Sequence, residues 1–225
     1  IRSYQAFDRD VEQFNRVAKP ISPLYVACGN AQLDETRSKR YFGLVESLSL
    51  KIGTNKNNTE LRALLLQRAV AYSTLQNFDA AIADLTTLLS IDSVSALAYW
   101  HRAVCQMAMS GFKASNGADV KLQEAGALSD LNRAIALQPQ NAYLYYCRAN
   151  LYHNQGNNDK AIADYSSAIK LDTRFAEAYF NRGLSYVARG DRSQGVKDLS
   201  KAGELGLYSA YNIIKKNSAS AAKKQ

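Results

Sequence analysis

The sequence contains few of the residues that most often carry chemistry. There are three cysteines and two histidines in 225 residues. An odd number of cysteines without metal-site spacing predicts neither a disulfide framework nor a metal centre. His101 and His153 lie far apart, and neither belongs to an H-E-x-x-H pattern. No catalytic constellation or phosphate-binding loop is present, so we expect no enzyme activity, no cofactor and no metal.

Long apolar runs and a basic stripe are also missing. No stretch approaches the roughly eighteen apolar residues of a membrane-spanning helix, so we expect no membrane insertion. The net charge is +8, but a terminal stretch without acids supplies four of the positive charges, at Lys215, Lys216, Lys223 and Lys224. Such a tail, rich in Ala and Ser, is usually solvated and disordered. Nucleic-acid binding requires a basic stripe along a folded face, so we expect no nucleic-acid partner.

The sequence does contain one unit that recurs. Residues 142–175 and 176–209 match each other with a spacing of 34 residues, which is typical of a helical solenoid. Two further copies lie upstream, at 62–95 and at 96–141, the second with a 12-residue insertion that begins near Gly111. We expect Gly111 to Ala118 to protrude at one edge. The matching residues of the two regular copies are Tyr145, Arg148, Ala149, Tyr152, Gly156, Asp164 and Ala168, and Tyr179, Arg182, Gly183, Tyr186, Gly190, Asp198 and Ala202.

The spacing within one unit is specific. Small residues at positions 8, 20 and 27 allow two antiparallel helices to approach, and large residues at positions 4, 11 and 24 fill the space beside them. This pattern resembles the tetratricopeptide repeat family. The resemblance implies an all-α right-handed superhelix of antiparallel helix pairs that acts as a non-catalytic scaffold for protein interactions. We expect helix pairs at 62–76 with 79–90, 142–155 with 159–171, and 176–189 with 193–204.

The segments outside the four repeats are expected to cap the array. Residues 1–60 read as an irregular helical segment, with a remnant of an earlier second helix at 11–17 and a helix from Asp34 to Gly53. Residues 61–209 form the repeats, and residues 210–225 form a capping helix, beginning near Ser209, and a basic tail. Because the chain starts at Ile1 rather than Met, we expect a processed protein or a fragment of a longer one, and we favour a C-terminal fragment of a longer bacterial repeat protein.

A charged pair recurs in every repeat. Position 7 is Arg and position 23 is Asp. Position 7 lies one turn from positions 4 and 11, on the buried side of the first helix, and a buried guanidinium requires a charged or multiply hydrogen-bonding partner. We therefore expect structural ion pairs rather than a ligand site. The four pairs are Arg68 with Asp84, Arg102 with Asp130, Arg148 with Asp164, and Arg182 with Asp198.

The binding face follows from the resemblance. In proteins of this family, positions 2, 5, 9, 12 and 13 of the first helices line the concave surface. Exposed aromatic residues on one face indicate an interaction surface, so we expect a protein or peptide partner. The alternative is a structural or oligomerising segment, whose groove is filled by the chain itself or by a second copy in a homo-oligomer. The candidate binding residues are Trp100, Tyr143, Tyr146, Asn150, His153 and Phe180.

The same positions argue against one familiar mode of binding. The family's carboxylate clamp uses Lys at position 5 and Asn at position 9. Here position 5 is Leu66, Trp100, Tyr146 or Phe180, and only Asn150 matches at position 9. We therefore expect a partner segment with apolar side chains rather than a strongly acidic one.

Overall fold

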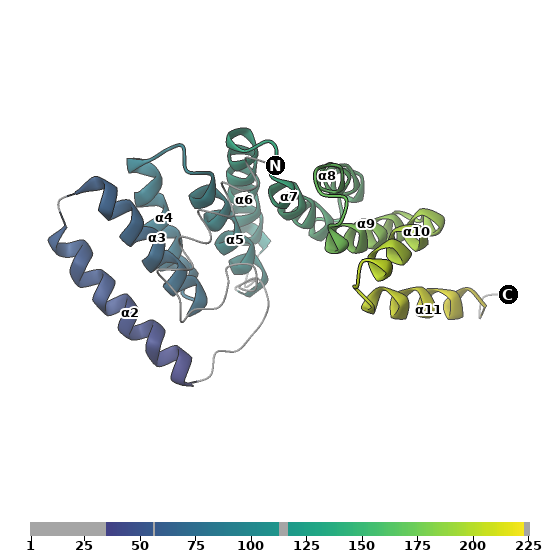
Figure 1. The fold of residues 1–225 in the computed structure, drawn as a ribbon, viewed down its shortest axis with the longest axis horizontal. Helices are drawn as coiled ribbons and strands as arrows, with labels where there is room; N and C mark the ends of the chain where they lie inside the picture. The colour runs from purple at the N-terminus through teal and green to yellow at the C-terminus, as the bar shows by residue number, and fades with distance from the viewer. Residues whose placement is uncertain (1–34, 56, 113–116, 223–225) are drawn as a thin grey trace. The chain divides into compact units, whose positions relative to one another are not determined.

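The chain folds into α-helices only, within the part that the structure describes. A computed structural model describes residues 35–55, 57–112 and 117–222 (Figure 1). No strand occurs in these ranges, so the predicted all-α fold is confirmed. None of the described helices is long and apolar enough to cross a bilayer. The helices are α2 (Glu35–Thr54), α3 (Asn58–Thr74), α4 (Phe78–Ile91), α5 (Ala96–Phe112), α6 (Gly117–Leu137), α7 (Ala142–Asn154), α8 (Asn158–Leu171), α9 (Ala176–Arg189), α10 (Arg192–Glu204) and α11 (Ser209–Ala222).

The helices belong to two compact units, and the chain divides between Pro139 and Gln140. The first unit holds α2 to α6 and the second holds α7 to α11. In the first unit, α3 packs against α4 and α5 against α6; in the second, α7 packs against α8 and α9 against α10. The three predicted helix pairs are therefore confirmed, with ends that agree to within four residues.

Side-chain caps decide where several of the helices begin. Asn57 accepts a hydrogen bond from the backbone N–H of Thr59 at 2.9 Å and caps α3. An N-cap amide of this kind satisfies a backbone donor that the helix leaves unpaired. For this reason α3 begins at Asn58, four residues before the predicted start. Asn77 and Asn157 cap the second helices of the first and third repeats in the same way.

The small and large positions of the repeat form the core. The residues at positions 8, 20 and 24 are buried in all four repeats, so each pair of helices approaches closely over small side chains and closes around one large residue. These residues are Ala69, Ala81 and Leu85; Ala103, Ala127 and Leu131; Ala149, Ala161 and Tyr165; and Gly183, Gly195 and Leu199.

In the fourth repeat both small residues are glycines, Gly183 and Gly195, and the two helices approach closely there. A Cβ placed on Gly195 would lie 2.8 Å from the backbone oxygen of Gly183 and 2.5 Å from a methyl carbon of Val187. The backbone oxygen cannot move aside without separating α9 from α10. Gly195→Ala should therefore lower the free energy of unfolding by about 1–2 kcal/mol, because the strain outweighs the gain in helix propensity. Denaturant titration measures this change.

A matched glycine in α2 provides the control. A Cβ on Gly43 would meet no atom within 4 Å, and the residue is exposed. Gly43→Ala should therefore stabilise the chain by about 0.5–1 kcal/mol, since only the helix propensity changes. If both substitutions stabilised the protein, the close approach of α9 and α10 would be contradicted.

Helix α2 packs against the first repeat as the second helix of a preceding repeat would. Tyr41 and Leu48 on its inner side are buried, and Ile52 packs against the apolar cluster that α3, α4 and α5 share. Its outer side leaves Phe42 and Leu50 exposed, at 60% and 75%. The helix thus covers the apolar side of α3. The expected helical remnant at 11–17 lies outside the described residues.

Helices extend further into two irregular segments than expected. At the insertion, α5 continues to Phe112 and α6 begins at Gly117. Residues 113–116 lie outside the described residues, so the expected protrusion of Gly111 to Ala118 stays a prediction. The C-terminal segment is not a short helix with an unstructured tail. Helix α11 continues to Ala222, because Ala is the strongest helix former and four of the last seven residues of the helix are Ala or Lys. Lys223 and Lys224 lie outside the described residues.

Candidate functional site

The arginine at position 7 and the aspartate at position 23 meet in every repeat. Each arginine donates from Nε and from Nη2 to the two oxygens of one carboxylate, at 2.6–2.8 Å. The four aspartates are buried, and the arginine side chains are 18–20% exposed. These hydrogen bonds raise the pKa of each guanidinium. A two-bond pair of this kind joins the two helices of a repeat with a fixed geometry.

Arg68, Arg102 and Arg182 also reach the preceding helix. Their Nη1 atoms donate at 3.0 Å to a hydroxyl oxygen, which is Ser49 for Arg68, Thr86 for Arg102 and Ser166 for Arg182. A tyrosine ring lies 5.5–5.8 Å from each of the four guanidinium groups. The donors of these arginines are therefore used within and between repeats.

Aromatic rings gather where α7 meets the start of α9 in the second unit. The centroids of Tyr146 and Phe175 are 4.8 Å apart, and those of Tyr143 and Tyr146 are 5.8 Å apart. Tyr143 and Phe175 stack at 6.3 Å with an interplanar angle of 16°. All three side chains are partly buried. The three rings thus form one continuous aromatic surface between α7 and the start of α9.

A polar network continues this surface along the two helices. The amide nitrogen of Asn181 donates to the hydroxyl of Tyr146 at 3.1 Å and to the amide oxygen of Asn150 at 3.0 Å. The hydroxyl of Tyr165 donates to the same oxygen at 2.6 Å. Burial raises the pKa of Tyr146 and of Tyr165, so both phenols stay neutral at ordinary pH.

His153 lies further along α7 and contacts α9. Its Nδ1 is 2.9 Å from the hydroxyl of Ser185 and 3.2 Å from the amide oxygen of Asn158. Ser185 is fully buried and donates its hydroxyl to the backbone oxygen of Asn181 at 3.0 Å. A buried serine whose proton is engaged by a carbonyl is not presented to a substrate. The arrangement therefore positions α9 against α7 and offers no nucleophile.

The remaining two predicted residues lie elsewhere. Phe180 is partly buried and packs against the apolar cluster of Leu199, Ala202 and Ala210. Trp100 belongs to the first unit and is 1% exposed, with its ring 5.8 Å from that of His101. The expectation of an exposed tryptophan is wrong, because the large apolar indole is covered rather than left in water. Trp100 therefore offers no free surface to a partner.

The comparisons with known proteins agree with the repeats seen in the structure. Three family models match the chain, one described as TPR repeat over residues 149–190 and two described as tetratricopeptide repeat over residues 131–163 and 63–94. The chain is a tetratricopeptide-repeat protein. Its repeats have the arginine–aspartate pairs and the small-residue contacts described above. A comparison with curated proteins finds no match.

Solved structures share the fold. A structure of MamA is 28% identical, with 80% of this chain and 99% of that chain covered and a TM-score of 0.63. TTC0263, a thermophilic TPR protein of Thermus thermophilus, is 21% identical, with 80% and 91% covered and a TM-score of 0.62. MamA from residue 41 of Desulfovibrio magneticus RS-1 is 18% identical, with 77% and 97% covered and a TM-score of 0.56. The latter two likenesses concern the fold alone.

Several residues of this tetratricopeptide-repeat protein were not found by counting positions in the sequence. Phe175 precedes α9, outside the first-helix positions considered, and Asn181 occupies position 6. Thr86 and Ser166 both occupy position 25 of their repeats. Their shared role as hydrogen-bond acceptors for the next arginine could therefore have been predicted from the alignment of the repeats. Among the described residues, no group of three or more His, Cys, Asp and Glu side chains is placed to hold a metal ion.

Proposed function

We propose that this tetratricopeptide-repeat protein binds a peptide or protein segment along the face that α7 and the start of α9 form in the second unit. The repeats make the chain a scaffold for protein interactions. The observation that carries the site is the joined aromatic and amide surface described above. We call it the α7–α9 face, and its residues are Tyr143, Tyr146, Asn150, Phe175, Glu177 and Asn181.

The chemistry of this face suits an extended or helical segment with apolar side chains. Aromatic rings held by their neighbours provide large contact area at small entropic cost, and carboxamides bond to a peptide backbone. Asn150 and Asn181 already hold one another and Tyr146 in place. The face is thus organised before a partner arrives, which lowers the cost of binding.

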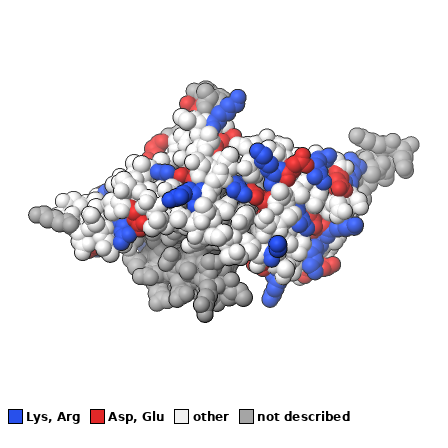
Figure 2. Space-filling view, turned by 90° about the horizontal axis from the view of Figure 1, so that it is seen from above, with Lys and Arg blue, Asp and Glu red and all other residues white. Residues whose placement is uncertain are grey.

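The alternative, a structural or oligomerising segment, has one observation in its favour. In the first unit Trp100, which occupies the same repeat position as Tyr146, is buried and cannot contact a partner. A recognition role is therefore proposed for the second unit alone. Nucleic acid remains outside the proposal, since Lys and Arg are interspersed with Asp and Glu on the face that Figure 2 shows, without a stripe of one sign.

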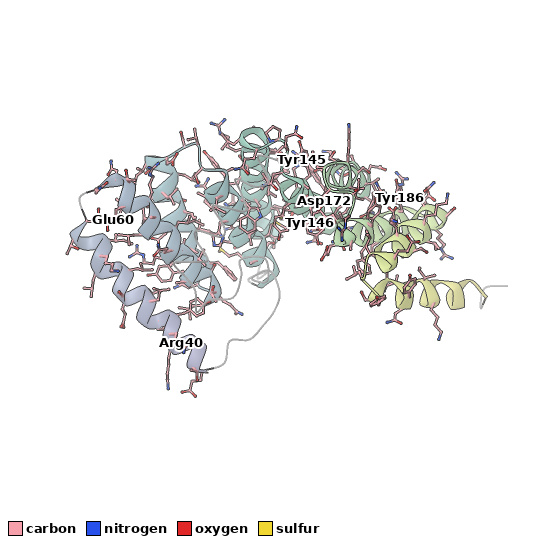
Figure 3. The ribbon with its side chains drawn as sticks, in the orientation of Figure 1. Arg40, Glu60, Tyr145, Tyr146, Asp172 and Tyr186 are labelled. Atoms are coloured by element: carbon pink, nitrogen blue, oxygen red, sulfur yellow. The ribbon has the colours of Figure 1, made fainter. Side chains whose placement is uncertain are left out.

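Two neighbouring tyrosines provide the test. Tyr145 and Tyr146 lie on the same helix, are both partly buried, and pack against the same apolar cluster, but leave α7 in different directions (Figure 3). Tyr145 lies against the guanidinium of Arg148 at 5.8 Å, whereas Tyr146 belongs to the α7–α9 face. Tyr146→Ala should weaken peptide binding by about 2 kcal/mol, as expected for a central aromatic residue.

The matched variant separates binding from folding. Tyr145→Ala should cost a similar amount of stability and leave binding unchanged. Retention of a randomised 12-residue peptide pool on the immobilised chain measures binding, and thermal unfolding measures stability. Equal retention by the wild type and Tyr146→Ala would rule out the α7–α9 face as the binding site.

A further inference from the structure

The α7–α9 face carries a single ionised side chain. Among positions 2, 5, 9, 12 and 13 of α7 and α9, only position 2 of α9 is charged at neutral pH, and it is Glu177. This carboxylate is exposed and lies in the first turn of α9. Among the described residues it takes part in no ion pair, whereas Arg148, Arg182, Arg189 and Lys201 of the same unit each pair with another carboxylate.

Glu177 is close to the aromatic surface. Phe175 stands two residues before it, and the ring of Phe175 is 4.8 Å from that of Tyr146. The charge of Glu177 contributes to the raised pKa of Tyr146, after burial, which is the larger cause. The negative charge of Glu177 thus acts on the ring of Tyr146, and the faces of aromatic rings themselves carry a negative quadrupole.

Elsewhere in the chain, an aromatic ring and a carboxylate are both in contact with a cation. In each repeat a guanidinium lies against a tyrosine ring and pairs with a carboxylate, as Arg148 does with Tyr145 and Asp164. The α7–α9 face presents the ring and the carboxylate, but no described Lys or Arg pairs with Glu177. We propose that the partner supplies this cation, as an Arg or Lys side chain that lies over Tyr146 and Phe175 and pairs with Glu177. This inference rests on the proposed function of the α7–α9 face.

The chemistry favours a cation over a neutral or acidic group. An Arg side chain places its apolar stem on the rings, attracts their quadrupole, and donates two parallel hydrogen bonds to a carboxylate. An acidic side chain would meet repulsion from both the rings and Glu177. The combined attraction of ring and exposed carboxylate corresponds to roughly fivefold to tenfold in affinity.

The experiment uses peptides that differ in one charge. Blocked nonapeptide pools have a central Arg, citrulline or Glu, and Ala, Leu, Ser and Tyr are randomised at the other positions. Citrulline has nearly the shape of Arg and no charge. The full chain, immobilised, should retain the Arg pool about fivefold to tenfold better than the citrulline pool, and the Glu pool least.

Two variants locate the effect. Glu177→Gln should make retention of the Arg and citrulline pools nearly equal. Glu204→Gln, which removes an exposed carboxylate of α10, should leave the preference for Arg intact. Thermal unfolding of both variants checks that the fold is kept.

The outcomes distinguish this inference from the proposed function. Equal retention of all pools by the wild type, with loss of retention in Tyr146→Ala, would overturn the cation site and leave the binding face in place. A preference for the Glu pool, or a preference for Arg that survives Glu177→Gln, would also overturn it. If the wild type retained no pool better than Tyr146→Ala does, both the cation site and the binding face would be overturned.

Discussion

Replacing Asp164 with Ala is expected to lower the free energy of unfolding by about 3 kcal/mol. The carboxylate of Asp164 accepts hydrogen bonds from Nε and Nη2 of Arg148 at 2.6 and 2.7 Å, and its side chain is 10% exposed. Removal of one partner leaves a guanidinium with little access to water, which costs roughly 3–5 kcal/mol for a buried pair. The lower end applies because the side chain of Arg148 is 20% exposed.

An exposed pair in the same unit provides the control. Asp159 also pairs with an arginine, Arg189, at 2.9 Å, but its side chain is 80% exposed. Asp159→Ala should have a much smaller effect, since water solvates both groups after the pair is broken. Urea titrations of the two variants make the comparison. Equal losses of stability in the two variants would mean that the stability contributed by an Arg–Asp pair does not depend on its burial.

Lowering the pH from 7 to 4 is expected to remove about 3 kcal/mol of stability through His101 alone. The side chain is 2% exposed, and burial lowers its pKa from 6.5 to about 4. Between these two values the unfolded chain binds a proton that the folded chain does not. The free energy of unfolding therefore falls as the pH falls through this window. The contribution of neutral His101 to the free energy of unfolding is fully retained above pH 6.5.

The environment of His101 explains the direction. Its Nε2 lies 3.2 Å from the hydroxyl of Ser73 on α3, and its Nδ1 has no hydrogen-bond partner among the described residues. An imidazolium in this place would carry a charge and a second N–H without an acceptor. His101→Gln and His101→Leu should both flatten the pH dependence of the free energy of unfolding, whatever their effect at pH 7. A slope equal to that of the wild type in both variants would show that His101 does not control it.

The helix pairs were predictable because their causes are local and repeat. Small residues occur at positions 8 and 20 of every repeat, so the closely packed pairs follow from Ala149 and Ala161 as they do from Gly183 and Gly195. The ends of the helices depend on single capping residues and on local helix propensity, and neither follows the 34-residue repeat. Asn57 caps α3 early, and the Ala-rich segment before Ala222 lengthens α11.

The candidate site was less predictable because exposure is a tertiary property. Position 5 holds Trp100 in one repeat and Tyr146 in the next, and the same count assigned both to an open face. Trp100 is buried, whereas Tyr146 is partly exposed and joins Phe175 and Asn181. Neighbouring helices determine whether the side chain at a given position is buried or exposed. The spacing of residues within one repeat therefore does not predict this exposure.

The hydrogen bonds from Nη1 of the repeat arginines have a consequence for local opening. Arg102 bonds to Asp130 of its own repeat and to Thr86 of the helix before it, and Arg182 does the same with Asp198 and Ser166. A helix pair that opens therefore also breaks a bond of its neighbour. Within each unit, backbone amide protons should exchange with solvent in blocks that span adjacent repeats, rather than one repeat at a time. No such arginine links α11 among the described residues, so its amides should exchange first.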